Sequence, residues 1–360
     1  MNKFYFISVL FLAGCSHSVL QGASRVPAAD QQVPPLKGNV DLLVTPDMDT
    51  HAAFIDRIDH SSSGHSIRLV MYHLTDSKVV DSLIAAKRRG ADVRVILDRS
   101  SLKQGKFHKS FQRLLDAGVL VKESPVAFSI THQKTMVVDE SEVFITAINL
   151  TNNADSTRDF GLIVHDSSVI KEVIQVFEAD WQNADSSDQF TPPVSEPHLV
   201  WSPVNSQDKL VSLIDSAHLK IISTVENLGD LKIQAAFGRA IKRGVGVRLI
   251  VPMCDKNKNP LLNYPFLTAL QGAGVESRVM PYPENTQQPY MHSKMIEVDG
   301  TTGYVGSVNF SPHSTLTARE LGILFTEQKP LQKISEDFEA DWLVSIPPPN
   351  KLPNSCPVVE

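Results

Sequence analysis

The stretch that decides the fold reads Met291-His292-Ser293-Lys294-Met295-Ile296-Glu297-Val298-Asp299, and it continues after a short turn as Gly303-Tyr304-Val305-Gly306-Ser307-Val308-Asn309. Apolar and polar residues alternate in both parts, as in β-strands whose successive side chains point to opposite faces. The pattern predicts a β-hairpin that gathers an imidazole, an ammonium, a hydroxyl and a carboxamide. Lysine and asparagine donate hydrogen bonds to phosphate oxygens, and histidine can attack phosphorus or protonate a leaving oxygen. The hairpin therefore predicts a phosphate site made by His292, Lys294, Ser307 and Asn309.

The same pattern occurs earlier in the chain, as His132-Gln133-Lys134 followed by Thr146-Ala147-Ile148-Asn149. Other segments repeat in the same order, and the offset between copies grows slowly, from 154 positions at Gly90 and Gly244 to 161 at the two Phe-Glu-Ala-Asp-Trp segments, 177–181 and 338–342. This indicates one duplicated unit with small loop insertions. Two such halves pack most economically about a pseudo-two-fold axis, which predicts that His132 and His292 meet.

Composition and periodicity predict an ordinary α/β protein. The chain has 360 residues, of which 42% are hydrophobic and 21% charged. Its formal net charge of −6 excludes a protein held to nucleic acid by a broad basic surface, although a small basic pocket remains allowed. Periodicity and turn signals predict helices over residues 50–60, 77–89 and 107–117, and strands over residues 67–72 and 93–97.

The first residues resemble a bacterial export signal. Lys3 precedes a short apolar run, and Leu12-Ala13-Gly14-Cys15 resembles a lipobox, in which cleavage precedes a cysteine that receives a lipid. Lipidation of Cys15 is the expectation, and a plain signal peptide with an incidental cysteine is the alternative. Ser16 at the next position favours the periplasmic face of the outer membrane. The expected organisation is a signal peptide at 1–14, a flexible tether at 15–38, a first half at 39–185, a linker at 186–198, a second half at 199–346 and a tail at 347–360.

Two further cysteines, Cys254 and Cys356, have no nearby histidine partners and are poor evidence for zinc. A disulfide and two inert thiols are the two alternatives, and an oxidising compartment would permit the disulfide.

The paired motifs, His-x-Lys followed by an aspartate and then by Gly-Ser-x-Asn, resemble those of the phospholipase D superfamily, over nearly all of residues 39–346. The resemblance implies two pseudo-symmetric halves, each a mixed β-sheet flanked by α-helices, with one active site at their interface. It also implies a monomer with an internal pseudo-dimer, no cofactor and no metal, because lysine and asparagine would balance the phosphate charge.

The resemblance also implies catalytic roles. His132 would be the nucleophile that forms a phosphohistidine, and His292 the acid/base, although pseudo-symmetry makes the opposite assignment conceivable. Lys134, Lys294, Asn149 and Asn309 would hold the phosphate oxygens. Asp159 and Glu320 lie 27 and 28 positions after His132 and His292, and acidic residues at these places would orient the imidazoles, each in its own half, so that Glu320 is the expected partner of His292; surface charges are the alternative.

Some residues carry open interpretations. Asp139 and Asp299 lie an odd number of positions from the histidines, so a regular strand would aim them away from the site, and we interpret them as structural. The first copy has Thr146-Ala147 where Gly-Ser is expected, and thus lacks the hydroxyl of Ser307. Tyr72-His73 and Glu226-Asn227 follow corresponding strands, where they line the pocket mouth or merely pack in loops.

The expected function is phospholipase D-type hydrolysis of phospholipid head groups at a membrane reached through lipidated Cys15. Transfer to a lipid alcohol, as in a cardiolipin synthase, is the near alternative, and a metal-independent nuclease is the third. A phospholipid-binding envelope protein without turnover is the non-enzymatic alternative. No obligatory protein partner is expected.

Overall fold

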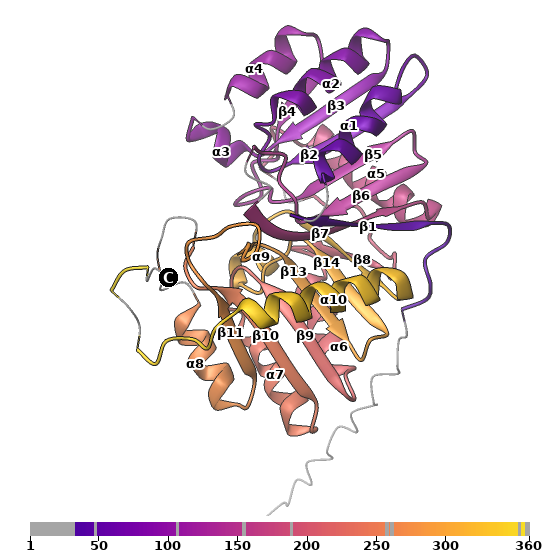
Figure 1. Ribbon diagram of the computed structural model, residues 1–360. Helices are drawn as coiled ribbons and strands as arrows, with labels where there is room; N and C mark the ends of the chain where they lie inside the picture. Colours follow the sequence, from indigo (N-terminus) through magenta and orange to yellow (C-terminus); the bar gives the residue numbers. More distant parts are fainter. Residues whose placement is uncertain are drawn as a thin grey trace, which may run out of the picture. The chain divides into compact units, whose positions relative to one another are not determined.

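The computed structural model describes residues 33–46, 49–105, 108–152, 156–187, 190–255, 259, 263–351 and 354–356. The expectations for the signal peptide, for Cys15 and for most of the tether lie outside these residues. Residues 33–360 form one compact unit, and this unit contains both halves of the duplication (Figure 1).

The first half supplies a sheet whose strands run in the order β1-β7-β6-β5-β2-β3-β4, with β12 from the second half paired to β7. Its elements are β1 (Val40–Thr45), α1 (Thr50–His60), β2 (Ser66–Met71), α2 (Ser77–Arg88), β3 (Asp92–Leu97), α3 (Arg99–Lys103), α4 (His108–Asp116), β4 (Leu120–Glu123), β5 (Lys134–Val138), β6 (Glu142–Thr146), β7 (Thr157–Val164) and α5 (Ser167–Gln182).

The second half supplies a seven-stranded sheet in the order β11-β10-β9-β13-β14-β15-β8. Its elements are β8 (Leu199–Ser202), α6 (Ser206–Asp215), β9 (Lys220–Val225), α7 (Leu231–Lys242), β10 (Gly246–Pro252), α8 (Tyr264–Gly272), β11 (Glu276–Met280), β12 (Tyr290–Met291), β13 (Lys294–Val298), β14 (Thr302–Gly306), α9 (Pro312–Leu316), β15 (Glu320–Phe325) and α10 (Gln328–Val344).

Apart from β12, each strand of the first sheet has its counterpart in the second, from β1 and β8 at one edge to β4 and β11 at the other, so the predicted duplication and the predicted α/β class are confirmed. In both sheets a parallel part, such as β2 with β3, joins an antiparallel part, such as β5 with β6. The sheets are therefore mixed, as expected. The helix predicted over residues 50–60 is α1, and the other predicted elements agree with the structure to within one or two residues.

Helices cover both faces of each sheet (Figure 1). One cluster of buried residues packs α1 and α2 on the first sheet, and another packs α6, α7 and α8 on the second. A third cluster joins α5, α10 and strands of both sheets, with Val305 and Phe338 among its members. Because this third cluster belongs to both halves, neither half can bury its apolar surface without the other.

Two buried ion pairs also connect the halves. Arg158 of β7 lies 2.8 Å from Asp341 of α10, and Arg319, just before β15, lies 2.8 Å from Asp180 of α5. The two aspartates are the equivalent residues of the repeated Phe-Glu-Ala-Asp-Trp segments. Each half therefore gives an arginine to the other half's helix, as pseudo-two-fold symmetry requires.

The chain enters the folded body earlier than the predicted tether boundary. The amide of Leu36 donates to Glu327, the amide of Lys37 donates to Asp166, and the carbonyl of Pro34 lies 2.8 Å from His198 Nε2. These contacts attach residues 34–37 to both halves. The expectation that the tether extends to residue 38 was therefore wrong at its last few residues.

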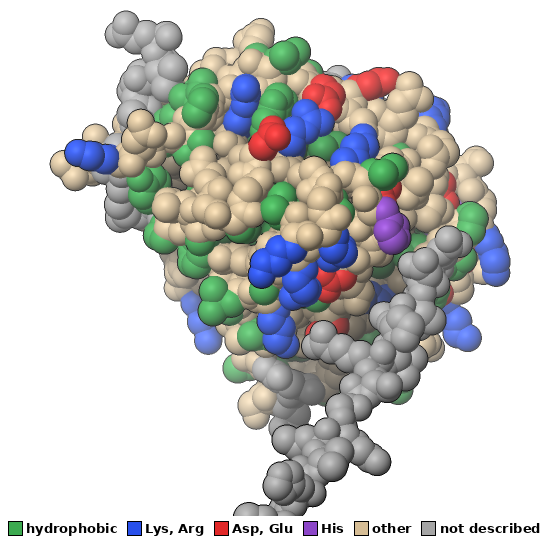
Figure 2. Space-filling view, turned by 90° about the horizontal axis from the view of Figure 1, so that it is seen from below, with side chains coloured by type: hydrophobic (Ala, Val, Ile, Leu, Met, Phe, Trp, Pro, Cys, Tyr) green, Lys and Arg blue, Asp and Glu red, His purple; other side chains and the backbone are tan. Residues whose placement is uncertain are grey.

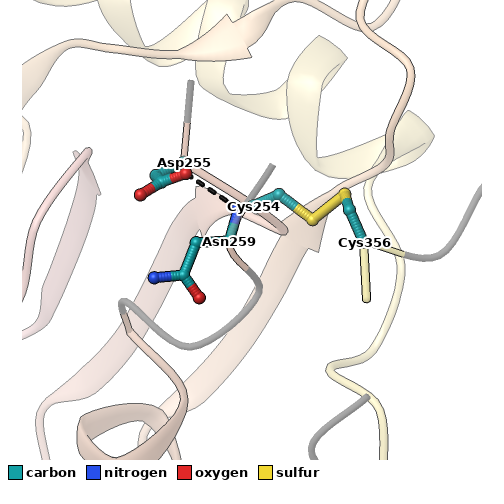
Figure 3. Close-up of a disulfide and its surroundings, with 4 residues drawn as sticks. All are labelled: Cys254, Asp255, Asn259 and Cys356. Carbon is teal, nitrogen blue, oxygen red and sulfur yellow. Dashed lines mark hydrogen bonds between the residues drawn. A yellow bond between two sulfur atoms is a disulfide. The ribbon is translucent and has the colours of Figure 1, made fainter. Parts of the chain in front are cut away.

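The two cysteines form a disulfide, Cys254–Cys356, with their Cα atoms 6.0 Å apart (Figure 3). Cys254 follows β10, and Asp255 beside it forms a backbone hydrogen bond with Asn259. Ile346 also exchanges backbone hydrogen bonds with Val279 of β11. Ile346 and Cys356 are therefore attached to the second half, the first at β11 and the second just after β10, and of the two alternatives for these cysteines the structure contains the disulfide.

Candidate active site

The two His-x-Lys segments meet at the interface between the halves. His132 and His292 lie two residues before the strands β5 and β13, and their ring centroids are 6.4 Å apart. Both side chains are almost entirely buried, with 7% of His132 and 3% of His292 exposed. The prediction that these two histidines meet is confirmed.

Each imidazole is bound by a carboxylate of the opposite half. His132 Nδ1 lies 2.8 Å from Oε2 of Glu320, and His292 Nδ1 lies 2.7 Å from Oδ1 of Asp159. The expectation that each acid orients the histidine of its own half, with Glu320 as partner of His292, was therefore wrong. The alternative of simple surface charges is also excluded, since both carboxylates are buried.

The exchange of partners follows from backbone pairing across the interface. His132 donates its amide hydrogen to the carbonyl of Arg319, and Ser293 donates its own to the carbonyl of Arg158. Residues Tyr290 and Met291 pair in parallel with the start of β7. The segment that carries each histidine therefore lies beside the acid-bearing strand of the other half. As a result Glu320, which follows Arg319, reaches His132, and Asp159, which follows Arg158, reaches His292.

The first half-site holds a neutral histidine. Burial, together with the nearby Lys134 and Lys294, lowers the pKa of His132 well below its usual value. Burial raises the pKa of Glu320 to about 7, against the opposing charge of Lys134. When Glu320 is ionised it accepts Nδ1–H, which leaves the lone pair of Nε2 available. His132 is thereby placed in the tautomer that a nucleophile requires.

The lysines and asparagines of both motifs are buried, as the two histidines are. Lys134 and Lys294 are each 1% exposed, and each donates to the carbonyl of the histidine two residues before it. Burial and the neighbouring charge of Lys294 lower the pKa of Lys134 well below its usual value, so a bound anion would restore its charged form. Asn149 Oδ1 has no hydrogen-bond partner among the described residues. Asn309 Oδ1 accepts from the amide of Asn227, which fixes its carboxamide.

The hydroxyl of Ser307 forms hydrogen bonds with the backbone of β15, the strand that begins with Glu320. Its hydroxyl accepts from the amide of Leu321 and lies 3.2 Å from the carbonyl of the same residue. Its own carbonyl lies 3.2 Å from His132 Nδ1. The backbone amide of Ser307 also donates to the carbonyl of Leu321, and in the first half the amide of Ala147 donates to the carbonyl of Phe160 in the same way. Ala147 has no hydroxyl to make the additional contacts. The hydroxyl expected to bind phosphate therefore has a positioning contact.

The Gly-to-Thr difference beside this position changes what faces a glycine across the sheet. Gly306 pairs with Gly322, and a Cβ on Gly306 would come within 2.3 Å of the Cα of Gly322, so the two backbones approach closely. Thr146 pairs with Gly161, and a Cβ on Gly161 would come within 2.4 Å of the Thr146 side chain. Both halves therefore need the glycine across the sheet, and the second half also needs one at the motif position.

Asp139 and Asp299 lie at the far ends of the hairpins. Asp139 accepts from the amide of Ser66, and Asp299 accepts from the amides of His218, Leu219 and Lys220. Both therefore fix the start of the neighbouring strand, which is a structural role. They do not reach the histidines, because they follow strands of five residues.

Sequence reasoning left two contacts of the site undecided. Tyr72, the residue after β2, packs its ring edge-on to His132 at 4.7 Å between centroids, with Lys134 Nζ 5.0 Å from its ring centre. Glu226, the residue after β9, lies 3.0 Å from Lys294 Nζ and 3.6 Å from His292 Nε2. Both belong to the site and not to loop packing, and their equivalent positions after corresponding strands were the signal in the sequence.

One face of the molecule carries charged side chains of both signs. The face drawn in Figure 2 mixes Lys and Arg with acidic and apolar side chains and carries no broad basic surface. Among the described residues, no helix is long and apolar enough to span a bilayer.

Comparisons with known proteins identify the two halves. The family described as "Cardiolipin synthase, PLD-like domain" matches residues 54–181 and 210–342. A "Probable cardiolipin synthase YwiE" of Bacillus subtilis is 24% identical over 297 residues, which are 73% of this chain and 57% of that protein. A "Phospholipase D" of Rickettsia felis is 28% identical over 154 residues, 42% of this chain and 72% of that protein. The chain thus spans little more than half the length of the first relative.

Two solved structures share the fold. The phosphatidylserine synthase of Haemophilus influenzae aligns with a TM-score of 0.66 and 13% identity, over 87% of this chain and 88% of that chain. A polyphosphate kinase of Porphyromonas gingivalis aligns with a TM-score of 0.63 and 16% identity, over 84% of this chain and 46% of that chain. Since the family match covers most of both halves, with the paired histidines and lysines inside it, the chain belongs to the phospholipase D-like family of cardiolipin synthase type.

Proposed function

We propose that the protein cleaves phospholipid phosphodiesters by a phospholipase D-type reaction, releasing the head-group alcohol and leaving phosphatidic acid. The observation that carries the proposal is the facing pair of imidazoles, each with its Nδ1 bound to a carboxylate of the other half. Because Nδ1 of each histidine is bound to a carboxylate, Nε2 of each is the nitrogen that can attack phosphorus or transfer a proton. A probable cardiolipin synthase of Bacillus subtilis matches 73% of the chain, and a phospholipase D of Rickettsia felis matches 42% of it.

The first step transfers the phosphatidyl group to His132. Its Nε2 attacks phosphorus, a P–N bond forms, the P–O bond to the head group breaks, and His292 gives its proton to the departing oxygen. Lys134, Lys294 and the two asparagines hold the non-bridging oxygens and stabilise the added negative charge of the transition state. Glu320 keeps the proton on Nδ1 of His132 and stabilises the cation that forms.

The second step returns the enzyme to its starting state. His292, now neutral, takes a proton from water, the new P–O bond forms, and the P–N bond to His132 breaks. If a lipid alcohol replaces water, the same step becomes the phosphatidyl transfer of a cardiolipin synthase. Cardiolipin synthases of Bacillus subtilis and Bacillus anthracis, each 24% identical and covering 73% and 81% of this chain, support transfer as the second candidate.

The assignment of roles rests on the electrostatic difference between the histidines. Burial and the charges of Lys134 and Lys294 lower the pKa of His132, which favours the neutral nucleophile. His292 has a second carboxylate beside it, with Asp159 at Nδ1 and Glu226 3.6 Å from Nε2, and these surroundings suit a proton donor. His132 as nucleophile and His292 as acid/base would serve hydrolysis and phosphatidyl transfer equally.

The decisive experiment incubates the protein with phospholipid carrying a labelled phosphate and stops the reaction with alkali, in which phosphohistidine survives. The expected result is a labelled peptide containing His132, absent from His132→Ala. Mass spectrometry of products from a mixed phospholipid panel, with and without glycerol, then separates hydrolysis from transfer. No adduct and no product from any lipid would refute the proposal and favour a phospholipid-binding envelope protein, and cleavage of short single-stranded nucleic acid alone would favour the nuclease.

We further propose that a lipid on Cys15 anchors the protein at the periplasmic face of the bacterial outer membrane, where it meets its substrate as a monomer. The support is the Leu-Ala-Gly-Cys pattern and the polar residues that follow it. Metabolic labelling with a radioactive fatty acid should mark the wild type and not Cys15→Ala. An unlabelled wild type in a bacterial envelope fraction would refute the anchor.

A further inference from the structure

One of the differences between the two half-sites lies at the first residue after β2 and the first residue after β9. In the first half this residue is Tyr72, whose ring packs against His132. In the second half it is Glu226, whose carboxylate lies near both Lys294 and His292. The phosphate pocket therefore has an aromatic wall on the side of one histidine and a negative charge on the side of the other.

Glu226 lies beside the position that the departing head group must occupy in the proposed reaction. Asp159 occupies Nδ1 of His292, so the proton for the departing oxygen comes from Nε2. That oxygen must approach Nε2 to about 3 Å, and Oε2 of Glu226 is already 3.6 Å from the same nitrogen. The first atoms of the alcohol beyond its oxygen therefore lie beside the carboxylate.

The position of Glu226 is fixed by its surroundings. Tyr290 donates its hydroxyl hydrogen to Oε1 at 2.9 Å, and Asn263 donates its side-chain amide to the backbone carbonyl of Glu226 at 2.7 Å. The side chain is 14% exposed. A carboxylate held in place and largely removed from water interacts with a neighbouring charge much more strongly than one in solution.

We infer that Glu226 determines head-group specificity, favouring an alcohol that carries hydroxyls or a positive charge and rejecting one that carries a negative charge. The inference rests on the proposed phosphodiester cleavage. Glycerol and ethanolamine can donate hydrogen bonds to the carboxylate, whereas the carboxylate of serine is repelled. The same repulsion acts on a nucleotide leaving group, which carries the next phosphate of its strand, so the residue also disfavours nucleic acid.

The test compares three phospholipids with identical acyl chains and with ethanolamine, glycerol or serine head groups, each diluted in the same detergent micelles. We expect wild type to have a kcat/KM about tenfold or more lower for the serine lipid, since one unfavourable charge contact of about 1.4 kcal/mol corresponds to tenfold. Glu226→Gln keeps the shape of the side chain and should reduce that preference about tenfold. Glu276→Gln, which removes one exposed charge of β11, serves as the control and should leave the preference unchanged.

The outcomes separate this inference from the proposed function. If Glu226→Gln slows all three lipids by the same factor, the residue only holds Lys294 and the inference is overturned, while the proposed function stands. If wild type releases no head group from any of the three and also fails to cleave bis(p-nitrophenyl) phosphate, the proposed function fails and the inference fails with it. A wild type that prefers the serine lipid would overturn the inference directly.

Discussion

Replacement of Glu320 by glutamine tests the proposed division of work between the histidines. Glutamine has nearly the same shape as glutamate, but its amide nitrogen can donate to Nδ1 of His132, which now lies 2.8 Å from a carboxylate oxygen. A donor at that place moves the ring proton to Nε2, where it blocks attack on phosphorus. We therefore expect Glu320→Gln to fold and to bind substrate while losing the first chemical step.

The size of the effect follows from two terms. In Glu320→Gln, the tautomer of His132 that can attack phosphorus no longer has its hydrogen-bond acceptor at Nδ1, and this costs about 1–3 kcal/mol. The cation that forms on His132 during attack also loses its charge-assisted hydrogen bond to Glu320, which costs about 1.5–3 kcal/mol. Together they amount to about 2.5–6 kcal/mol, or roughly a 10²- to 10⁴-fold lower kcat. Glu320 is fully buried, so solvent does not screen either term.

The assay compares Glu320→Gln with the matched variant Asp159→Asn of the other half-site, on a natural phospholipid and on a phosphatidyl ester of p-nitrophenol. Nitrophenolate departs without a proton, so the activated ester should restore the first step in Asp159→Asn, visible as a burst of nitrophenol, and should not restore it in Glu320→Gln. If the activated ester rescues Glu320→Gln instead, the roles of His132 and His292 are reversed. If Glu320→Gln retains activity within about threefold of wild type, the tautomer reasoning is wrong.

Four further outcomes are expected. First, kcat/KM should fall as the pH decreases through about 7, because Glu320, whose pKa burial raises to about 7, is then protonated and no longer accepts Nδ1–H; a pH–rate profile that is flat between about 6 and 8 would contradict this. Second, Ser307→Ala should impair turnover more than Ala147→Ser changes it, since the Ser307 hydroxyl bonds the backbone beside Glu320; comparable small effects in a phosphodiester assay would show that the hydroxyl is dispensable. Third, Asp341→Asn should lower the free energy of unfolding by about 3–5 kcal/mol, since it leaves the buried Arg158 charge unpaired; denaturant unfolding measures this, and a loss below about 1 kcal/mol would mean that the pair does not join the halves. Fourth, EDTA should leave activity unchanged, because lysines supply the positive charge at the phosphate; loss of activity that a divalent ion restores would overturn the metal-free mechanism.

Local sequence patterns predicted most of the fold. Alternation of apolar and polar residues marked the hairpins, turn residues marked the ends of helices, and the repeated segments marked the duplication. These features depend on neighbours within a few positions, or on copies that can be compared directly within the chain. The two motif histidines and lysines could be found for the same reason.

Contacts between the halves were harder to predict. Arg158 and Asp341 are 183 positions apart, and nothing near either residue indicates that the other is its partner. A signal existed nonetheless, because an arginine before each acid and an aspartate in each Phe-Glu-Ala-Asp-Trp segment recur in both halves. Repetition predicts that these residues matter, but it does not say whether they pair within a half or between halves.

The sequence by itself determined which side chains the site contains, through the duplicated motif and its fixed spacing along each hairpin. Only the tertiary structure decided which of them work together: Glu320 with His132, Asp159 with His292, and Glu226 beside Lys294. The physical reason is that spacing within a hairpin is set by strand geometry, whereas partners across the pseudo-two-fold interface are set by backbone pairing and by the core that both sheets share.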